Sequence, residues 1–300
     1  MRPVLKSLVA VFALIFASGP KAQAVDFYAT NGLNNNLYGI DIDGTTTLIG
    51  PSGNTQNLLF DIARDLVSQS YFYLESETTG NRSALVYSAT IGASGGTQTQ
   101  VGAPFSSLFV EGGLAFSSFR GTNTLYASGL EVGSSVLYSI DQTNGAATLV
   151  SSNFIPVGNA DIQSIFNAPD GRLWGLNQKT TTEANLFRFA TDGTVDTTVL
   201  VASGFEITGT GGVTVKNGVT YYLTSPQSFA NSNFGTFAWD SGNNTYTGAY
   251  NLISSSIIGG MTGIALAPTT VPEPSTYVLA AIASGVMAAL ARRRKAKLVK

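Results

Sequence analysis

Three carboxylates recur at a constant interval and are the residues best suited to chemistry. Asp61, Glu111 and Asp161 are 50 residues apart, at or just before short runs rich in small residues. Carboxylate oxygens bind Ca²⁺, and a pair of carboxyl groups can act as acid and nucleophile in glycoside hydrolysis. The alternative interpretation is that they are solvated residues at strand starts. Asp61 also aligns better with Gly113 than with Glu111, so the three positions are not strictly in phase.

A second set of acidic residues favours a structural role. Asp41, Asp141 and Asp240 recur at one point of a repeat, and the run from Asp41 to Gly44 resembles the start of a calcium loop. Ser52 stands at the twelfth position, where such a loop needs a bidentate Glu. We therefore expect these aspartates to shape turns between strands.

Composition excludes several classes of site. The chain has 300 residues with 0 Cys and 0 His, which rules out disulfides, a cysteine nucleophile, a Ser-His-Asp triad and His-ligated zinc. No organic cofactor is indicated, and Ca²⁺ is the one metal that the carboxylates suggest. Residues 25–270 hold seven basic and 17 acidic residues, a net charge of −10. An acidic body argues against nucleic-acid binding, which needs Lys and Arg surfaces.

The N-terminus has the pattern of a secretory signal helix. Arg2 and Lys6 precede ten apolar residues, and Ala22 and Ala24 supply the small residues that a signal peptidase requires. Ten apolar residues are too few for a stable span of about 30 Å of hydrocarbon, which disfavours an uncleaved anchor. We predict a signal peptide over residues 1–24, cleaved after Ala24.

The C-terminus, residues 271–300, has three parts in a fixed order. The sequence VPEPST, with Pro272, Glu273 and Pro274, comes first, and the prolines keep it extended. A 15-residue apolar run over 277–291 predicts a transmembrane helix, which flanking residues and snorkelling arginines can extend. The basic run RRRKAK then holds the tail in the cytoplasm and leaves the body outside.

This order of motif, helix and basic run resembles the PEP-CTERM sorting signal of Gram-negative bacteria. The resemblance implies recognition by an exosortase, a membrane-embedded processing enzyme, through Pro272, Glu273 and Pro274. It also implies an inner-membrane-anchored precursor with its body in the periplasm, followed by display or release near exopolysaccharide. The alternative is a plain C-terminal anchor after a proline-rich linker.

The body, residues 25–270, repeats with a period near 50. Aromatic residues in LYxID-like runs recur at intervals of 49, 51, 49 and 50: Tyr38, Tyr87, Tyr138, Phe187 and Phe237. Each period predicts four strands, namely a small-residue strand, an aromatic strand, the LYxID-like strand and a Thr-rich edge strand. Repeated four-stranded sheets of this length indicate propeller blades.

The ends of the array predict how the ring closes. The body starts with an aromatic strand and ends with a small-residue strand over 261–267, so the two ends complete one blade. We therefore expect an all-β, five-bladed propeller in which the first and last strands pair, which removes an open edge. An irregular β-sandwich or β-solenoid is the alternative. The repeats also loosely resemble propeller-like families of exported bacterial proteins.

Two functional hypotheses follow. The first is a non-enzymatic binding or structural protein outside the cell, associated with exopolysaccharide or biofilm. Loops rich in Ser, Thr, Asn and Gly, with Phe105, Phe154 and Phe205 among them, suit sugar binding, although these rings could equally pack in the core. The second is a propeller glycoside hydrolase or lyase that uses carboxylates at the mouth of the channel. Fold alone decides neither.

Overall fold

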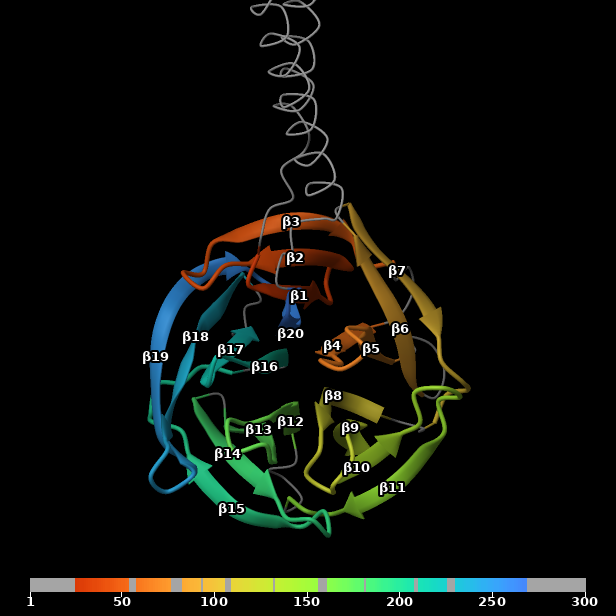
Figure 1. Ribbon diagram of the computed structural model, residues 1–300. Helices are drawn as coiled ribbons and strands as arrows, with labels where there is room; N and C mark the ends of the chain where they lie inside the picture. The colour runs from red at the N-terminus through yellow and green to blue at the C-terminus, as the bar shows by residue number, and fades with distance from the viewer. Residues whose placement is uncertain are drawn as a thin grey trace, which may run out of the picture. The chain divides into compact units, whose positions relative to one another are not determined.

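The computed structural model describes residues 25–268, except residues 54–57, 77–82, 93, 106–108, 132, 156–160, 181, 208–209 and 226–229. Five antiparallel four-stranded sheets surround a central axis (Figure 1). The five-bladed propeller is therefore confirmed, and the sandwich and solenoid alternatives are wrong. The expected signal helix and transmembrane helix lie outside the described residues. Within the described residues, no helix is long and apolar enough to cross a membrane.

Four blades are continuous in sequence. Blade one comprises β4 (Leu58–Arg64), β5 (Tyr71–Ser76), β6 (Ala84–Gly92) and β7 (Gly95–Gln100). Blade two comprises β8 (Phe109–Ser117), β9 (Thr124–Glu131), β10 (Ser134–Ile140) and β11 (Ala147–Ser152). Blade three comprises β12 (Asp161–Asn167), β13 (Leu173–Thr180), β14 (Glu183–Phe189) and β15 (Val195–Leu200). Blade four comprises β16 (Thr210–Lys216), β17 (Val219–Ser225), β18 (Asn231–Asp240) and β19 (Thr245–Ile258).

Blade five is built from both ends of the body. It comprises β1 (Phe27–Asn31), β2 (Asn36–Ile40), β3 (Thr46–Pro51) and β20 (Met261–Leu266), in the order β20-β1-β2-β3. Strands β1 and β20 are antiparallel, with Ala29 opposite Ile264. Each small-residue strand lies innermost and each Thr-rich strand outermost, as the repeat predicted.

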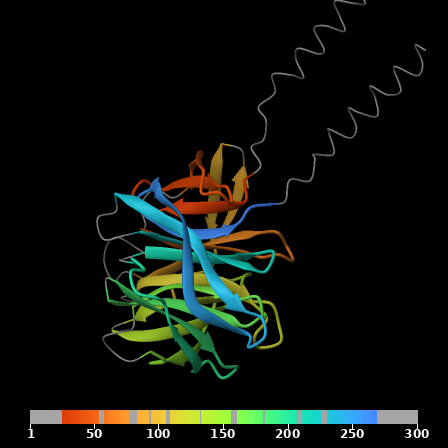
Figure 2. The same ribbon diagram turned by 90° about the vertical axis from the view of Figure 1, so that its left-hand side faces the viewer.

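The alternation of strands gives the propeller two distinct faces (Figure 2). We call the side where the innermost strands begin the loop face, and the side where they end the turn face. Short turns such as Asn217-Gly218 lie on the turn face, and both residues have the positive φ that a primed hairpin turn requires (52° and 77°). The described chain ends meet there, because the N–H of Ala267 donates to the carbonyl of Asp26 at 3.1 Å.

Aromatic residues of the inner strands and neighbouring segments hold the blades together. Trp174 of blade three packs edge-on against Tyr246 of blade four, with ring centroids 4.8 Å apart. Phe72 of blade one meets Phe116 of blade two at 5.5 Å. Such ring pairs add about 0.5–1.5 kcal/mol each beyond the area they bury. Of the recurring aromatics, Tyr38, Phe187 and Phe237 are buried in the core, and Phe205 also belongs to it, 2% exposed.

The closure of blade five can be tested with an engineered disulfide, because the chain has no native cysteine. The Oγ atoms of Thr30 and Thr262 are 3.1 Å apart across the closure. We expect Thr30→Cys combined with Thr262→Cys to form a disulfide and raise Tm. A loop of 232 residues corresponds to a gain of about 5 kcal/mol in the loop-entropy treatment.

The measurement is Tm of the oxidised and the reduced protein. A matched control combines Thr30→Cys with Thr220→Cys, which lies in blade four and should not crosslink. If the Thr30 and Thr262 pair stays reduced under oxidising conditions, β1 and β20 do not pair as described.

Candidate functional site

The axis of the propeller is occupied by the side chain of Asp61. Each innermost strand has one unpaired edge, so its N–H groups need acceptors near the axis. Asp61 is 2% exposed. Its Oδ1 accepts the N–H of Ile62 at 2.8 Å and its Oδ2 accepts the N–H of Leu114 in blade two at 2.9 Å. The N–H of Ile264 in blade five also donates to this carboxylate.

Ser164 extends this network to the remaining blades. Its hydroxyl donates to Asp61 Oδ2 at 3.4 Å and accepts the N–H of Val213 in blade four at 3.1 Å. One carboxylate and one hydroxyl therefore connect all five blades. The sequence analysis did not predict this role. The alignment of Asp61 with Gly113 was the available indication, because Gly113 belongs to the small-residue strand, which lies innermost.

Glycine completes the ring because no space remains for other side chains. A Cβ at Gly113 would lie 2.1 Å from the nitrogen of Ile165, and one at Gly263 would lie 2.5 Å from Asp61 Oδ1. Both distances are below any real Cβ contact. A carboxylate side chain at the Gly263 position would collide with Asp61, so this part of the ring has room for one acidic side chain.

Burial raises the pKa of the Asp61 carboxyl well above its usual range, and the hydrogen bonds from Leu114, Ile62, Ser164 and Ile264 oppose that shift. A raised folded-state pKa means that the folded protein holds the proton more tightly than the unfolded chain. Asp61 therefore contributes stability below about pH 4, and this contribution is lost as pH rises through the folded-state pKa.

A cavity of about 340 Å³ lies along the axis on the turn face. Residues that follow the ring line it, with Phe116 and Phe166 among its apolar walls and Asn123, Asn167 and Thr214 among its polar groups. Several of these polar groups are engaged within the protein: Ser117 donates to Asn167 at 2.9 Å, and Asn123 donates to Asp65 at 2.9 Å. The cavity is a candidate binding site, and its walls are held in place by these contacts.

Arg64 lies at the cavity beside the described chain ends. Its Nη1 donates to the carbonyl of Ala267 at 2.7 Å, and its guanidinium lies 5.6 Å from the centroid of Tyr71. These contacts tie blade one to the end of blade five. They account for the position of Arg64 without a ligand.

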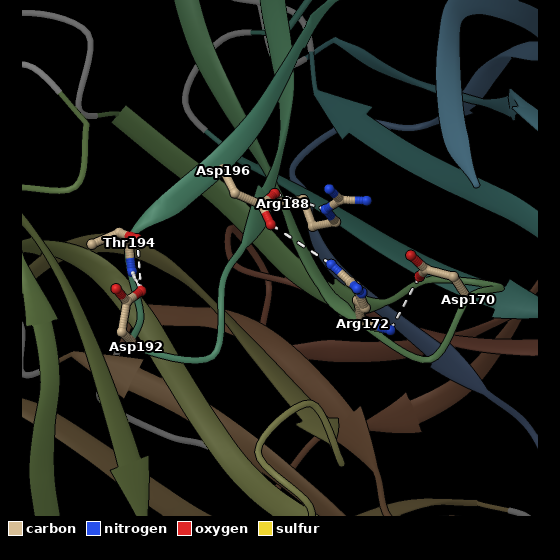
Figure 3. A network of polar contacts seen from close by, with 6 residues as sticks. All are labelled: Asp170, Arg172, Arg188, Asp192, Thr194 and Asp196. Atoms are coloured by element: carbon tan, nitrogen blue, oxygen red, sulfur yellow. Dashed lines mark hydrogen bonds and ion pairs between the residues drawn. The ribbon is translucent and has the colours of Figure 1, made fainter. Parts of the chain in front are cut away.

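A charged network covers the turn face of blade three (Figure 3). Asp196 accepts from Arg188 Nε at 2.7 Å and lies 3.6 Å from Arg172 Nη1. Arg188 also lies over the ring of Trp174, 5.8 Å from its centroid. The two arginines are thus paired with an acid on their own blade, which leaves no open basic cluster in this network for an anionic ligand.

The recurring turn aspartates have the structural role that their spacing indicated. Oδ1 of Asp141 accepts the N–H of Thr143 at 2.8 Å, and Oδ1 of Asp240 accepts the N–H of Gly242 at 2.9 Å. In the turn that contains Asp41, this bond is made by Asp43, which accepts from Thr45 at 2.9 Å. Asp192 does the same for Thr194, as Figure 3 shows. These carboxylates are acceptors that fix the turns.

The three periodic carboxylates do not occupy equivalent positions. Asp61 lies in the axial ring, Glu111 is the bulge residue of β8, and Asp161 is the first residue of β12, opposite Gln178. The side chains of Glu111 and Asp161 lie outside the described residues, so a shared Ca²⁺ site remains a prediction. The N–H groups around Asp61 disfavour a cation at that carboxylate. Among the described side chains, no group of three or more acidic residues could hold a metal ion.

The remaining predicted site residues belong to the chain ends. Ala22, Ala24, Pro272, Glu273 and Pro274 lie outside the described residues. The PEP-CTERM protein-sorting motif family matches residues 270–295. The chain carries a PEP-CTERM sorting motif. This motif implies an exported, membrane-anchored precursor and processing by an exosortase.

Comparison with solved structures supports the fold. An engineered GH43 glycoside hydrolase with endo-xylanase and exo-arabinofuranosidase activity superposes with a TM-score of 0.51 and 8% identity, over 82% of this chain and 54% of that chain. The chain therefore spans about half the length of that enzyme. The GH43_1 enzyme of Xanthomonas citri in complex with xylose has a TM-score of 0.48 and 10% identity, over 71% of this chain and 79% of the enzyme.

A lectin of Aleuria aurantia in complex with α-methyl-L-fucoside has a TM-score of 0.44 and 11% identity, over 77% of this chain and 73% of the lectin. Among curated proteins, none matches the sequence. At these identities the likeness concerns the fold alone.

The axial role of Asp61 predicts a specific pattern of stability. Asp61→Ala leaves the N–H groups of Ile62 and Leu114 without an acceptor, and we expect it to lower the free energy of unfolding by roughly 3 kcal/mol. Asp61→Asn keeps one acceptor and cannot titrate. The stability of the native protein relative to Asp61→Asn should therefore fall as pH rises from about 4. Denaturant unfolding at several pH values measures both effects.

Asp43→Asn is the control with the opposite sign. Hydrogen bonds from Thr45 lower the pKa of Asp43, so its contribution to stability is present above about pH 4 and is lost on acidification. An Asp61→Ala protein as stable as the native protein would show that the axial carboxylate does not hold the blades together.

Proposed function

We propose that this chain is an exported propeller that binds extracellular polysaccharide without chemically altering it. Signal peptidase removes residues 1–24, the body folds in the periplasm, and an exosortase processes the tail at Pro272, Glu273 and Pro274. The body is then displayed at the cell surface or released into the exopolysaccharide matrix. The sorting motif supports this export route. The hydrogen bonds that engage Asp61 at the axis favour binding over catalysis.

The engagement of Asp61 is the observation that carries this proposal. A glycosidase needs two carboxyl groups about 5–9.5 Å apart that are free to exchange protons or attack a sugar. Among the side chains that the structure describes, Asp61 is the acidic one in the axial ring, and its oxygens accept hydrogen bonds from three other blades and its own strand. Asp61 is 2% exposed and its oxygens are engaged within the ring, so a sugar has no access to it.

The binding and hydrolase hypotheses can be separated with a polysaccharide panel. The exported protein, purified from the cell surface or medium, is run in native gels that contain dextran, laminarin, galactomannan or alginate. We expect at least one polymer to retard the protein, with no new reducing ends after prolonged incubation. Turnover of any polymer would favour the hydrolase or lyase. Absence of both retention and turnover would leave a structural role or a protein partner.

Processing of the tail is tested separately. We expect the exported native protein to have a mass that lacks residues 1–24 and the basic tail. Replacing Pro272, Glu273 and Pro274 with Ala, Gln and Ala should leave full-length tail on a protein that stays in the membrane fraction. Pro268→Ala, an exposed change just upstream, is the control and should be processed normally. Normal processing of the triple variant would show that the tripeptide is not the recognised element.

A further inference from the structure

A second pocket lies in blade four, on the side of the loop face. Its volume is about 250 Å³, and its lining includes Phe205, Glu206, Tyr222, Asn233 and Tyr250. Thr224, which also lines the pocket, is near the loop-face end of β17, and Asn233 is near the start of β18. The pocket is thus separate from the axial cavity, which opens on the turn face.

Blade four has this pocket because its outer strand is longer than the others. Strand β19 has 14 residues, whereas β3, β7, β11 and β15 have six each. Leu252 and Ser255, which lie beyond the sixth residue of β19, line the pocket, and the segment over residues 201–207 forms a second wall. In that segment the N–H of Ala202 donates to the carbonyl of Gly248 near the start of β19 at 2.8 Å, and the carbonyl of Glu206 accepts from Thr224 of β17 at 3.1 Å. The wall of the pocket is therefore anchored at two points.

The aromatic side chains form a rigid platform. Phe205 is buried and holds Tyr250 edge-on, with ring centroids 5.2 Å apart and an interplanar angle of 74°. Tyr222 contacts both rings, at 4.9 Å from Phe205 and 6.3 Å from Tyr250. Tyr250 itself is half-buried. A tyrosine fixed in this way presents ring surface to a ligand with little loss of conformational entropy.

Polar groups without partners surround this platform. The carboxylate of Glu206 and the amide of Asn233 make no hydrogen bond to any residue that the structure describes, and Ser255 also lines the pocket. An aromatic face beside free carboxylate and amide groups matches a pyranose, which has apolar C–H faces and a rim of hydroxyls. Glu206 repels anions, and the described lining contains no Lys or Arg.

We propose that the pocket of blade four binds a single neutral pyranose unit of a polysaccharide. The sugar stacks on Tyr250, and its hydroxyls bond to Glu206 and Asn233. The volume, below the roughly 300–1,000 Å³ of pockets for drug-sized ligands, suits one sugar residue of a longer chain. This inference rests on the proposed function, which supplies the class of ligand, a polysaccharide. What it adds is the location of the site and its preference for uncharged sugars.

The test is the mobility of the exported full protein in native gels that contain dextran, laminarin or galactomannan as neutral probes and alginate as the anionic probe. We expect retention by a neutral polymer and none by alginate. Tyr250→Ala should weaken retention about tenfold or more, and Asn233→Ala about fivefold, from the loss of stacking and of one hydrogen bond. Tyr250→Phe keeps the ring and should retain most of the binding.

Two variants guard against loss of folding as the cause. Leu149→Ala changes an exposed residue of the outer strand of blade two and should bind normally. Asn233→Ala alters a polar side chain outside the aromatic core, and its Tm should match that of the native protein. Glu206→Gln should weaken discrimination against alginate, because it removes the negative charge.

The outcomes separate this inference from the proposed function. If a neutral polymer retains the native protein and the Tyr250→Ala and Asn233→Ala proteins equally, the blade-four site is wrong and the binding function stands. Tighter retention by alginate than by every neutral polymer would also overturn the site. If no polymer retains the native protein, both proposals fail.

Discussion

The fold depends on supplying acceptors to the unpaired inner edges of five strands. These N–H groups converge at the axis, where there is almost no space. The acceptor must therefore be a small side chain that accepts several hydrogen bonds, and it cannot be present in every blade. Asp61 meets these requirements with Ser164, and Gly113, Gly212 and Gly263 leave room for them. Five identical repeats would place five carboxylates at the axis, where like charges a few ångströms apart would oppose burial. The axis must therefore depart from the repeat even though the rest of each blade keeps it.

Pairing of β1 with β20 has a consequence for display. The pairing places Asp26 and Ala267 side by side on the turn face, and Arg64 fixes the carbonyl of Ala267. Both described ends of the body therefore leave from one face. The blade-four pocket lies toward the loop face, away from Asp26 and Ala267. The pairing that closes the ring therefore places the described ends of the body and the proposed binding pocket on different faces.

The sequence was sufficient for the architecture but not for the chemistry. The period near 50, the aromatic positions and the incomplete ends were enough to predict five blades and the β1–β20 closure, because inter-blade packing requires the same residue types at the same points of every repeat. The role of Asp61 could not be predicted, because it depends on donors from strands that are far apart in sequence. The equal spacing of Asp61, Glu111 and Asp161 was misleading as evidence of equivalence. The bulges of β4, β8 and β12 fall at Phe60, Glu111 and Gln163, so equivalent points of the blades are not exactly 50 residues apart. The blade-four pocket could not be predicted either, because the extra length of β19 does not change the period near 50.

Two parts of this repeat scaffold, the axis and blade four, depart from the pattern that the blades share. At the axis the departure is structural: the carboxylate of Asp61 accepts N–H groups of neighbouring blades, and replacing it would remove an acceptor that the inner edges need. At blade four the departure is peripheral: eight additional residues in β19, relative to the six-residue outer strands, support a wall of aromatic and polar groups without touching the ring. Change in the outer part of this pocket costs little stability, because Glu206 is exposed and Asn233 and Tyr250 are only partly buried. In the proposed function, this division places a sugar at the flank of the propeller and leaves the axis to hold the blades together.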